Sequence, residues 1–164
     1  MTPAETFEKG VEYRLAGNAS FKEQNWKSAL TNYYSAILHL KTVGGQQEKE
    51  EYKKKSEEQL VLIYNNMCAV FSKQDKWDRV LSYAKKAEEL DPDNIKAKFR
   101  LGQAYSRAGD LENAKSYLTQ VQEKNPNDPL VKSELSKLNS EEKKSEDKQR
   151  AIYRAMMTKF AGDS

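Results

Sequence analysis

The stretch LGQAYSRAGDLENAKSYLTQV, residues 101–121, decides the fold because its small residues recur at fixed intervals. Gly102, Ala114 and Val121 are separated by 12 and then by 7 positions. The same two intervals occur twice upstream, in the sets Gly17, Ala29 and Ala36, and Cys68, Val80 and Ala87. Small side chains let the backbones of two crossing helices approach closely. The spacing therefore predicts three stacked pairs of antiparallel helices.

The repeat length follows from Cys68 and Gly102, which stand 34 residues apart. We place repeats at about 10–43, 61–94 and 95–128, within a repeat domain over 1–128, and Pro92 and Pro126 end the second and third repeats. Bulky residues are expected to fill the core between them: Phe21, Trp26, Tyr33, Tyr64, Phe71, Trp77, Phe99, Tyr105 and Leu118.

Two segments lie outside the 34-residue spacing. Residues 44–60 form an insertion in which Gly44-Gly45 ends a helix, and the charged remainder predicts a solvated loop followed by an N-terminal extension of the next helix. Residues 129–164 have apolar residues at helical spacing around a charged centre, which predicts a capping and extension helix.

Composition favours an all-α protein and argues against several functions. The chain has 28 basic and 25 acidic residues, a net charge of +3, which is not the basic excess of a general nucleic-acid binder. Cys68 is the one cysteine, so no intramolecular disulfide can form. With no bilayer-length apolar run and no apolar signal core at the N-terminus, we expect a soluble, cytoplasmic protein without a membrane partner.

Candidate residues for chemistry are few. His39 is the single histidine and has no cysteine cluster or second histidine to join, and Gly44-Gly45 lacks the Lys-Ser/Thr of a phosphate-binding loop. We therefore expect no enzyme activity, no catalytic residue, no cofactor and no metal site.

Polar residues recur instead on the predicted first helix of each repeat. Arg14 and Asn18 are four residues apart, as are Lys96 and Arg100, and Asn66 occupies the second repeat. First helices line the inside of a solenoid, so these five side chains should converge. Three cations and two amides suit the two carboxylates of a peptide that ends in aspartate.

The chain resembles the tetratricopeptide-repeat (TPR) family through AGNASFKEQNWKSALTNYYSAI (residues 16–37) and LGQAYSRAGDLENAKSYLTQV (residues 101–121). The resemblance implies a right-handed TPR solenoid of three repeats plus a capping helix. At the five polar positions the chain is similar to the carboxylate-clamp TPR domains of co-chaperone adaptors, which bind the C-terminal EEVD motif of heat-shock proteins 90 and 70. The first clamp position carries Arg14, where the family more commonly has Lys. Accessory contacts to the tail are expected from Lys73, Phe99, Gln103 and Arg107.

The segment DKQRAIYRAMMTKFA, residues 147–161, resembles the tail that follows the TPR domain of large FKBP-type immunophilins. That resemblance implies calmodulin as a further partner, although a capping helix explains the same amphipathic pattern. A TPR scaffold that binds a partner without an EEVD tail remains the alternative function. The sequence leaves open the choice between the two heat-shock proteins, the oligomeric state, and whether a prolyl isomerase domain precedes the repeats.

Overall fold

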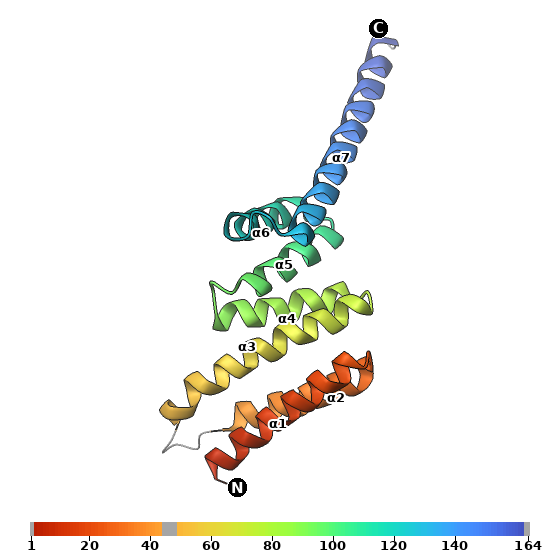
Figure 1. Ribbon diagram of the computed structural model, residues 1–164. Coiled ribbons are helices and arrows are strands. Elements are labelled where there is room, and N and C mark those ends of the chain that lie inside the picture. Colours follow the sequence, from red (N-terminus) through yellow and green to blue (C-terminus); the bar gives the residue numbers. More distant parts are fainter. Residues whose placement is uncertain (1, 44–48, 163–164) are drawn as a thin grey trace.

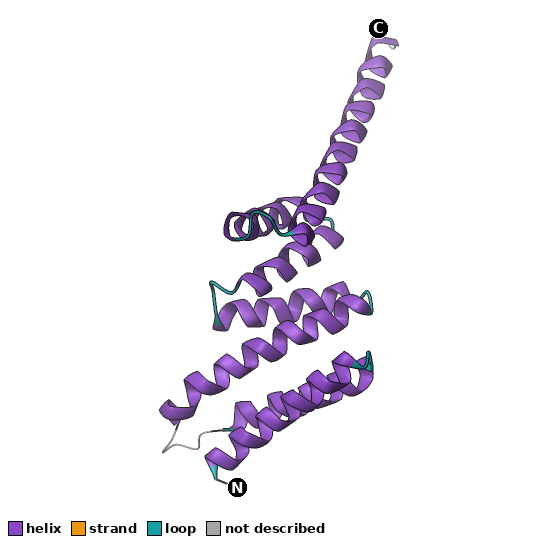
Figure 2. Ribbon diagram, in the orientation of Figure 1, coloured by secondary structure: helices purple, strands orange, loops and turns teal. Residues whose placement is uncertain are grey.

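The protein is helical throughout the part of the chain that the computed structural model describes, residues 2–43 and 49–162 (Figure 2). The helices are α1 (Pro3–Lys22), α2 (Trp26–Thr42), α3 (Lys49–Lys73), α4 (Trp77–Leu90), α5 (Ile95–Arg107), α6 (Leu111–Lys124) and α7 (Pro129–Gly162). The all-α solenoid predicted from the repeat is confirmed. The predicted helix break at Gly44-Gly45 lies outside the described residues.

Helices pair in chain order and the pairs stack along one axis (Figure 1). α1 packs on α2, α3 on α4 and α5 on α6, while the first helices α1, α3 and α5 also contact one another in turn and α5 contacts α7. The nine small residues of the three spaced sets are all buried at these crossings. One face of the stack is therefore built from first helices, as the repeat requires.

Two glycines show why the crossing positions must be small. A Cβ added to Gly17 would lie 2.5 Å from Cε1 of Tyr33, and one added to Gly102 would lie 2.7 Å from Cγ of Leu118. Tyr33 and Leu118 are themselves fully buried. Each glycine therefore makes room for a large side chain of the paired helix.

The turns inside the repeats share one backbone geometry. Gln24, Asp75 and Gly109 each precede the first residues of a second helix and have φ of 60°, 56° and 82°. The next helix is then capped by Asn25 or Asp110, whose side chains accept a hydrogen bond from the backbone N–H of Ser28 or Asn113. This repeated turn fixes the antiparallel packing of each pair.

Helices α1 and α3 are longer than one repeat requires. α1 begins at Pro3 rather than near residue 10. A capping box between Thr2 and Glu5 stabilises this start. In the described part of the insertion, α3 is already helical at residue 49, and the rings of Tyr52 and Phe7 lie 5.7 Å apart. Ser56 is buried. α3 therefore includes the N-terminal extension expected from the sequence, and through Tyr52 this extension packs against the extra turns of α1.

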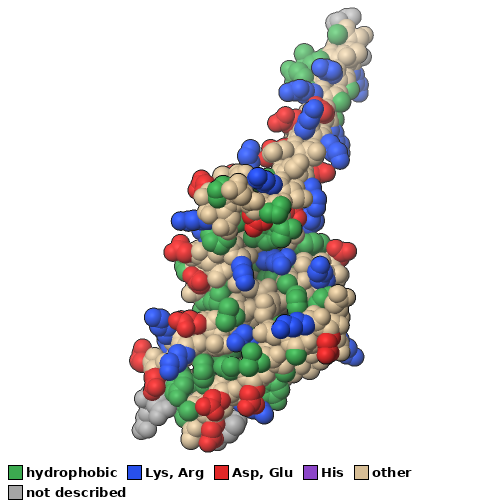
Figure 3. Space-filling view, in the orientation of Figure 1, with side chains coloured by type: hydrophobic (Ala, Val, Ile, Leu, Met, Phe, Trp, Pro, Cys, Tyr) green, Lys and Arg blue, Asp and Glu red, His purple; other side chains and the backbone are tan. Residues whose placement is uncertain are grey.

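Helix α7 covers the end of the stack with its first turns and then leaves it (Figure 1). Val131 and Leu138 are buried, whereas Leu130 is 65% exposed. Every described residue from 143 to 162 is exposed, and apolar and basic side chains mix toward the tip (Figure 3). The exposed apolar side chains there are Ile152, Tyr153, Met156, Met157 and Phe160. Calmodulin binding at this segment stays a prediction.

No helix within residues 2–43 and 49–162 combines the length and the apolar character needed to cross a bilayer.

We expect Cys68 to resist alkylation in the folded protein. Its side chain is fully buried, and its Sγ–H donates to the carbonyl oxygen of Val80 at 3.4 Å. Burial raises the pKa of the thiol to about 12, so the reactive thiolate is scarce at pH 8. Iodoacetamide at pH 8 should leave the native protein unmodified and alkylate it rapidly in guanidinium, as measured by mass spectrometry. Equal rates in the two conditions would contradict the buried position.

Candidate functional site

The two asparagines of the predicted set meet although 48 residues separate them. Nδ2 of Asn66 on α3 donates to Oδ1 of Asn18 on α1 at 2.9 Å, and the hydroxyl of Tyr33 donates to the same oxygen at 2.7 Å. Two donors on one oxygen fix the orientation of the Asn18 amide. Its nitrogen is then the atom of Asn18 that can donate to a ligand.

Arg14 lies one turn before Asn18 on α1 and is held from α3. Its Nε donates to Oε1 of Gln59 at 2.7 Å. That bond uses one edge of the guanidinium and leaves the two Nη groups as donors. The sequence did not single out Gln59, but it lies seven residues before Asn66, two helical turns away on the same face of α3.

Arg100 is placed by polar contacts on both sides. Its Nη1 donates to Oε1 of Gln103 at 3.1 Å and to Oγ of Ser72 at 3.4 Å. Burial lowers the pKa of Arg100, but an arginine keeps its charge at neutral pH. A partly desolvated cation attracts a carboxylate more strongly than an exposed one. Lys96, one turn earlier, is exposed.

A hollow of about 380 Å³ lies between α3, α5 and the end of α6 with the start of α7. Asn66, Lys96 and Arg100 belong to its polar lining, which also includes Asn65, Asn125 and Asp128. Apolar side chains form the other wall: Ile95, Phe99, Val121, Leu130 and Val131. Three of the five predicted residues therefore share one hollow. Asn18 and Arg14 are not part of its lining, and Asn18 is hydrogen-bonded to Asn66.

The four accessory residues lie in different environments. Phe99 lines the hollow, and Lys73 is exposed at the end of α3. Gln103 and Arg107 instead donate to Glu134 of α7, with Gln103 Nε2 3.1 Å from Oε1 and Arg107 Nη1 3.1 Å from Oε2. In this structure those two side chains face an internal carboxylate.

Glu134, which holds these two side chains of α5, is a buried charged residue that the sequence analysis did not identify. It lies on the buried stripe of α7 that also carries Val131, Leu135 and Leu138, so it is a charged residue at an apolar position. That position was the available signal, because a buried carboxylate requires a partner.

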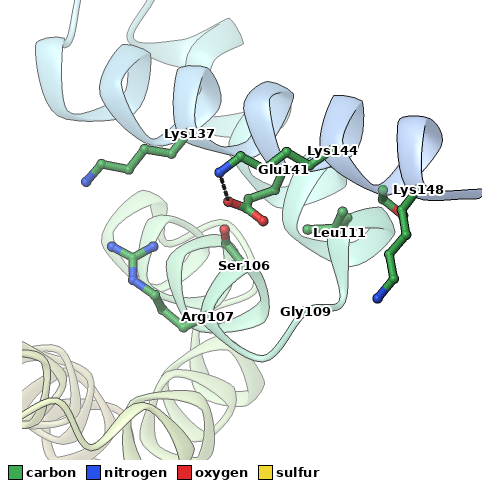
Figure 4. Close-up of a pocket in the computed structure, with 9 residues that line it drawn as sticks. Ser106, Arg107, Gly109, Leu111, Lys137, Glu141, Lys144 and Lys148 are labelled. Atoms are coloured by element: carbon green, nitrogen blue, oxygen red, sulfur yellow. Dashed lines mark hydrogen bonds and ion pairs between the residues drawn. The ribbon is translucent and has the colours of Figure 1, made fainter. Parts of the chain in front are cut away.

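A second hollow, of about 760 Å³, separates the α5–α6 turn from α7 (Figure 4). Its cationic lining comes from Arg107, Lys137, Lys144 and Lys148, and Lys144 Nζ lies 3.5 Å from Oε1 of Glu141. Arg107 stands at the α5 side of this hollow. Arg100, Gln103 and Arg107 follow one another along α5 in this order, and Arg107 is nearest to its C-terminal end.

His39 has a structural environment. Its Nδ1 hydrogen-bonds with the carbonyl oxygen of Ser35 at 2.8 Å, and its ring lies 5.2 Å from that of Tyr13. Across the described ranges, no three His, Cys, Asp or Glu side chains are grouped in a way that could hold a metal ion.

The stacked pairs, the small residues at their crossings and the matching turns define a TPR-like solenoid fold, and residues 72–138 match the tetratricopeptide repeat family. This fold is a protein-interaction module. The structure is similar to the C-terminal TPR-containing domain of an FK506-binding protein of Plasmodium falciparum, with a TM-score of 0.79 at 23% identity over 90% of this chain and 97% of that one. The expected likeness to the TPR domain of FKBP-type proteins is confirmed.

Two further comparisons give proteins to which this chain is similar. The peptidyl-prolyl cis-trans isomerase FKBP42 of Arabidopsis thaliana is 24% identical over 160 residues, which are 95% of this chain and 43% of that protein. The first TPR domain of Spaghetti (RPAP3), bound to the HSP90 peptide SRMEEVD, has a TM-score of 0.63 at 21% identity over 81% of this chain and 94% of that one. The chain spans less than half the length of the curated relatives it matches.

Proposed function

We propose that this chain is a co-chaperone-type adaptor that binds the C-terminal EEVD peptide of heat-shock protein 90, heat-shock protein 70 or both. The binding residues are Arg14, Asn18, Asn66, Lys96 and Arg100, which we call the clamp set. The observation that carries the proposal is the contact of Asn18 with Asn66 beside a hollow that Lys96 and Arg100 also line.

The clamp set offers donors to two carboxylates at once. A chain that ends in aspartate carries a main-chain carboxylate and a side-chain carboxylate within a few ångströms. Arg100 supplies a partly buried guanidinium, Lys96 an exposed ammonium, and the asparagines supply neutral N–H donors. Charge-assisted hydrogen bonds from several fixed donors replace the water that the carboxylates lose.

The apolar wall of the same hollow supports a peptide that is not purely acidic. Phe99, Ile95 and Leu130 lie beside the cations, so an aliphatic side chain next to the terminal aspartate can bury apolar surface there. The valine of EEVD has this chemistry. The bound peptide of the Spaghetti (RPAP3) domain ends in the same four residues.

A TPR scaffold for a partner without a free C-terminal carboxylate is the competing function. We also propose a cytoplasmic location, where cytoplasmic chaperones would be available to the adaptor.

Isothermal titration calorimetry with the free-acid peptide MEEVD and its C-terminally amidated form tests this proposal. We expect the amidated form to bind at least about tenfold more weakly, because one charge-assisted hydrogen-bonding group worth about 1.5–3 kcal/mol is lost. Binding of the free acid should also weaken as salt rises. Equal affinities for the two forms, or no binding of either, would support the scaffold instead.

A further inference from the structure

Glu134 is a charged residue in the apolar contact between α7 and the third repeat. It is 5% exposed and lies between Val131 and Leu138, which are both buried. A carboxylate in such a place is maintained only where fixed donors replace water. The identity of those donors connects α7 to the clamp set.

Two side chains of α5 supply the donors. Arg107 binds both carboxylate oxygens, with Nη1 3.1 Å from Oε2 and Nη2 3.2 Å from Oε1, and Gln103 Nε2 donates to Oε1 at 3.1 Å. Burial raises the pKa of Glu134, but the hydrogen bonds from Arg107 and Gln103 and the nearby positive charges outweigh burial and lower it. Glu134 is therefore ionised at neutral pH.

The same contact orients Gln103 toward the clamp set. An amide has a donor end and an acceptor end, and Glu134 can bind only the donor end. The acceptor oxygen of Gln103 is consequently left to face Arg100, whose Nη1 donates to it at 3.1 Å. A chain of hydrogen bonds thus runs from α7 through Gln103 to the clamp.

We propose that Glu134 determines the specificity of the clamp set by occupying the donors of Gln103 and Arg107. The inference rests on the proposed function. Peptide glutamates upstream of the terminal Val-Asp then find the paired Nη edge of Arg107 and one N–H of Gln103 already engaged. The clamp set binds the terminal aspartate through Lys96, Arg100 and the two asparagines. Glu134 of α7 limits the binding of further peptide glutamates along α5.

Displacement of Glu134 by a peptide carboxylate is unfavourable for two reasons. The displaced carboxylate would stay within the α7 contact without its partners, whereas a peptide glutamate would gain only a pair near the surface. Arg107 is also held by Trp77, since its guanidinium carbon lies 4.8 Å from the ring centroid. Arg107 therefore has two fixed contacts before any ligand arrives.

The substitution Glu134→Gln tests the proposal because it removes the charge and keeps the shape. We would measure by calorimetry the affinities for MEEVD and for MQQVD, in which both glutamates are neutral. The ratio of the two affinities should rise by about threefold in Glu134→Gln relative to the unmodified protein, since Arg107 becomes available for a surface-type ion pair. Lys73 is present in both proteins and cancels from this comparison.

Lys137→Gln is the matched control, because it removes a neighbouring α7 charge whose Nζ lies 4.0 Å from Glu134 Oε1. It should leave the ratio unchanged, and Glu134→Gln combined with Arg107→Gln should abolish the gain. An unchanged ratio in folded Glu134→Gln, or an equal rise in Lys137→Gln, would overturn the inference while leaving the proposed function intact.

Nuclear magnetic resonance of the unmodified protein tests the inference even if the Glu134→Gln variant fails to fold. The side-chain N–H signals of Gln103 and Arg107 should shift equally little on saturation with MEEVD and with MQQVD. Large shifts with MEEVD alone would show that the peptide reaches these donors and would overturn the inference. If neither peptide binds the unmodified protein, the proposed function and the inference fail together.

Discussion

Replacing both Lys96 and Arg100 with alanine is expected to weaken binding of a free-acid EEVD peptide by at least about 100-fold. Each cation supplies a charge-assisted hydrogen bond worth about 1.5–3 kcal/mol, and each 1.4 kcal/mol corresponds to a tenfold change in affinity. The loss should exceed that of a rim charge because Arg100 is partly desolvated, with Nη1 held by Ser72 and Gln103. Calorimetry with MEEVD measures the effect.

Lys98→Ala is the control for this loss of charge. Lys98 lies on the same helix, but its Nζ donates to Oε1 of Gln120 on α6 at 2.9 Å, away from the hollow. We expect the affinity of the Lys98→Ala variant for MEEVD to stay within about twofold of that of the unmodified protein. Arg100→Met keeps most of the aliphatic contacts of Arg100 and separates lost charge from lost packing. Retention of binding in the folded double variant would remove these two residues from the site.

Gly17→Val is expected to cost about 3 kcal/mol of stability and to impair the clamp set at the same time. A Cβ at this position already lies 2.5 Å from Cε1 of Tyr33, so the ring must move or the two helices must separate. Tyr33 is fully buried and its hydroxyl donates to Oδ1 of Asn18. Displacing the ring therefore removes one of the two donors that orient Asn18.

Urea denaturation followed by circular dichroism measures the stability of Gly17→Val, and titration with MEEVD below its transition measures binding. Ala16→Val is the matched control, since residue 16 is exposed on the same turn of α1 and carries the same introduced side chain. Its stability should fall by less than about 1 kcal/mol, the helix-propensity cost of valine. Equal destabilisation by the two substitutions would contradict the close contact at Gly17.

The fold was predictable because its signal is repeated three times. Gly17, Cys68 and Gly102 occupy equivalent crossings, and a chance match at one crossing would not have recurred at the others. The packing of the extended helices was less predictable. The upstream extension of α3 places the ring of Tyr52 against that of Phe7 on α1, and this contact exists only once the first two repeats are stacked.

The candidate site, like the fold, was predictable only in part. The repeat positions alone place Arg14, Asn18, Asn66, Lys96 and Arg100 on first helices. They do not reveal that Asn18 and Asn66 share a hydrogen bond, or that Gln103 and Arg107 face Glu134. The accessory contacts of Gln103 and Arg107 were predicted from their positions on α5, and what those two side chains meet depends on α7.

The amino-acid sequence by itself determined the helical class, the register of the repeats and the five polar positions, because helix periodicity and side-chain size are local properties repeated along the chain. Tertiary structure decided which polar atoms are still available to a ligand. A side chain such as Arg107 loses or keeps its donors according to what packs against it, and its partner Glu134 comes from 27 residues further along the chain. Local periodicity carries no information about that partner, because hydrogen-bond satisfaction is settled only when the helices are packed.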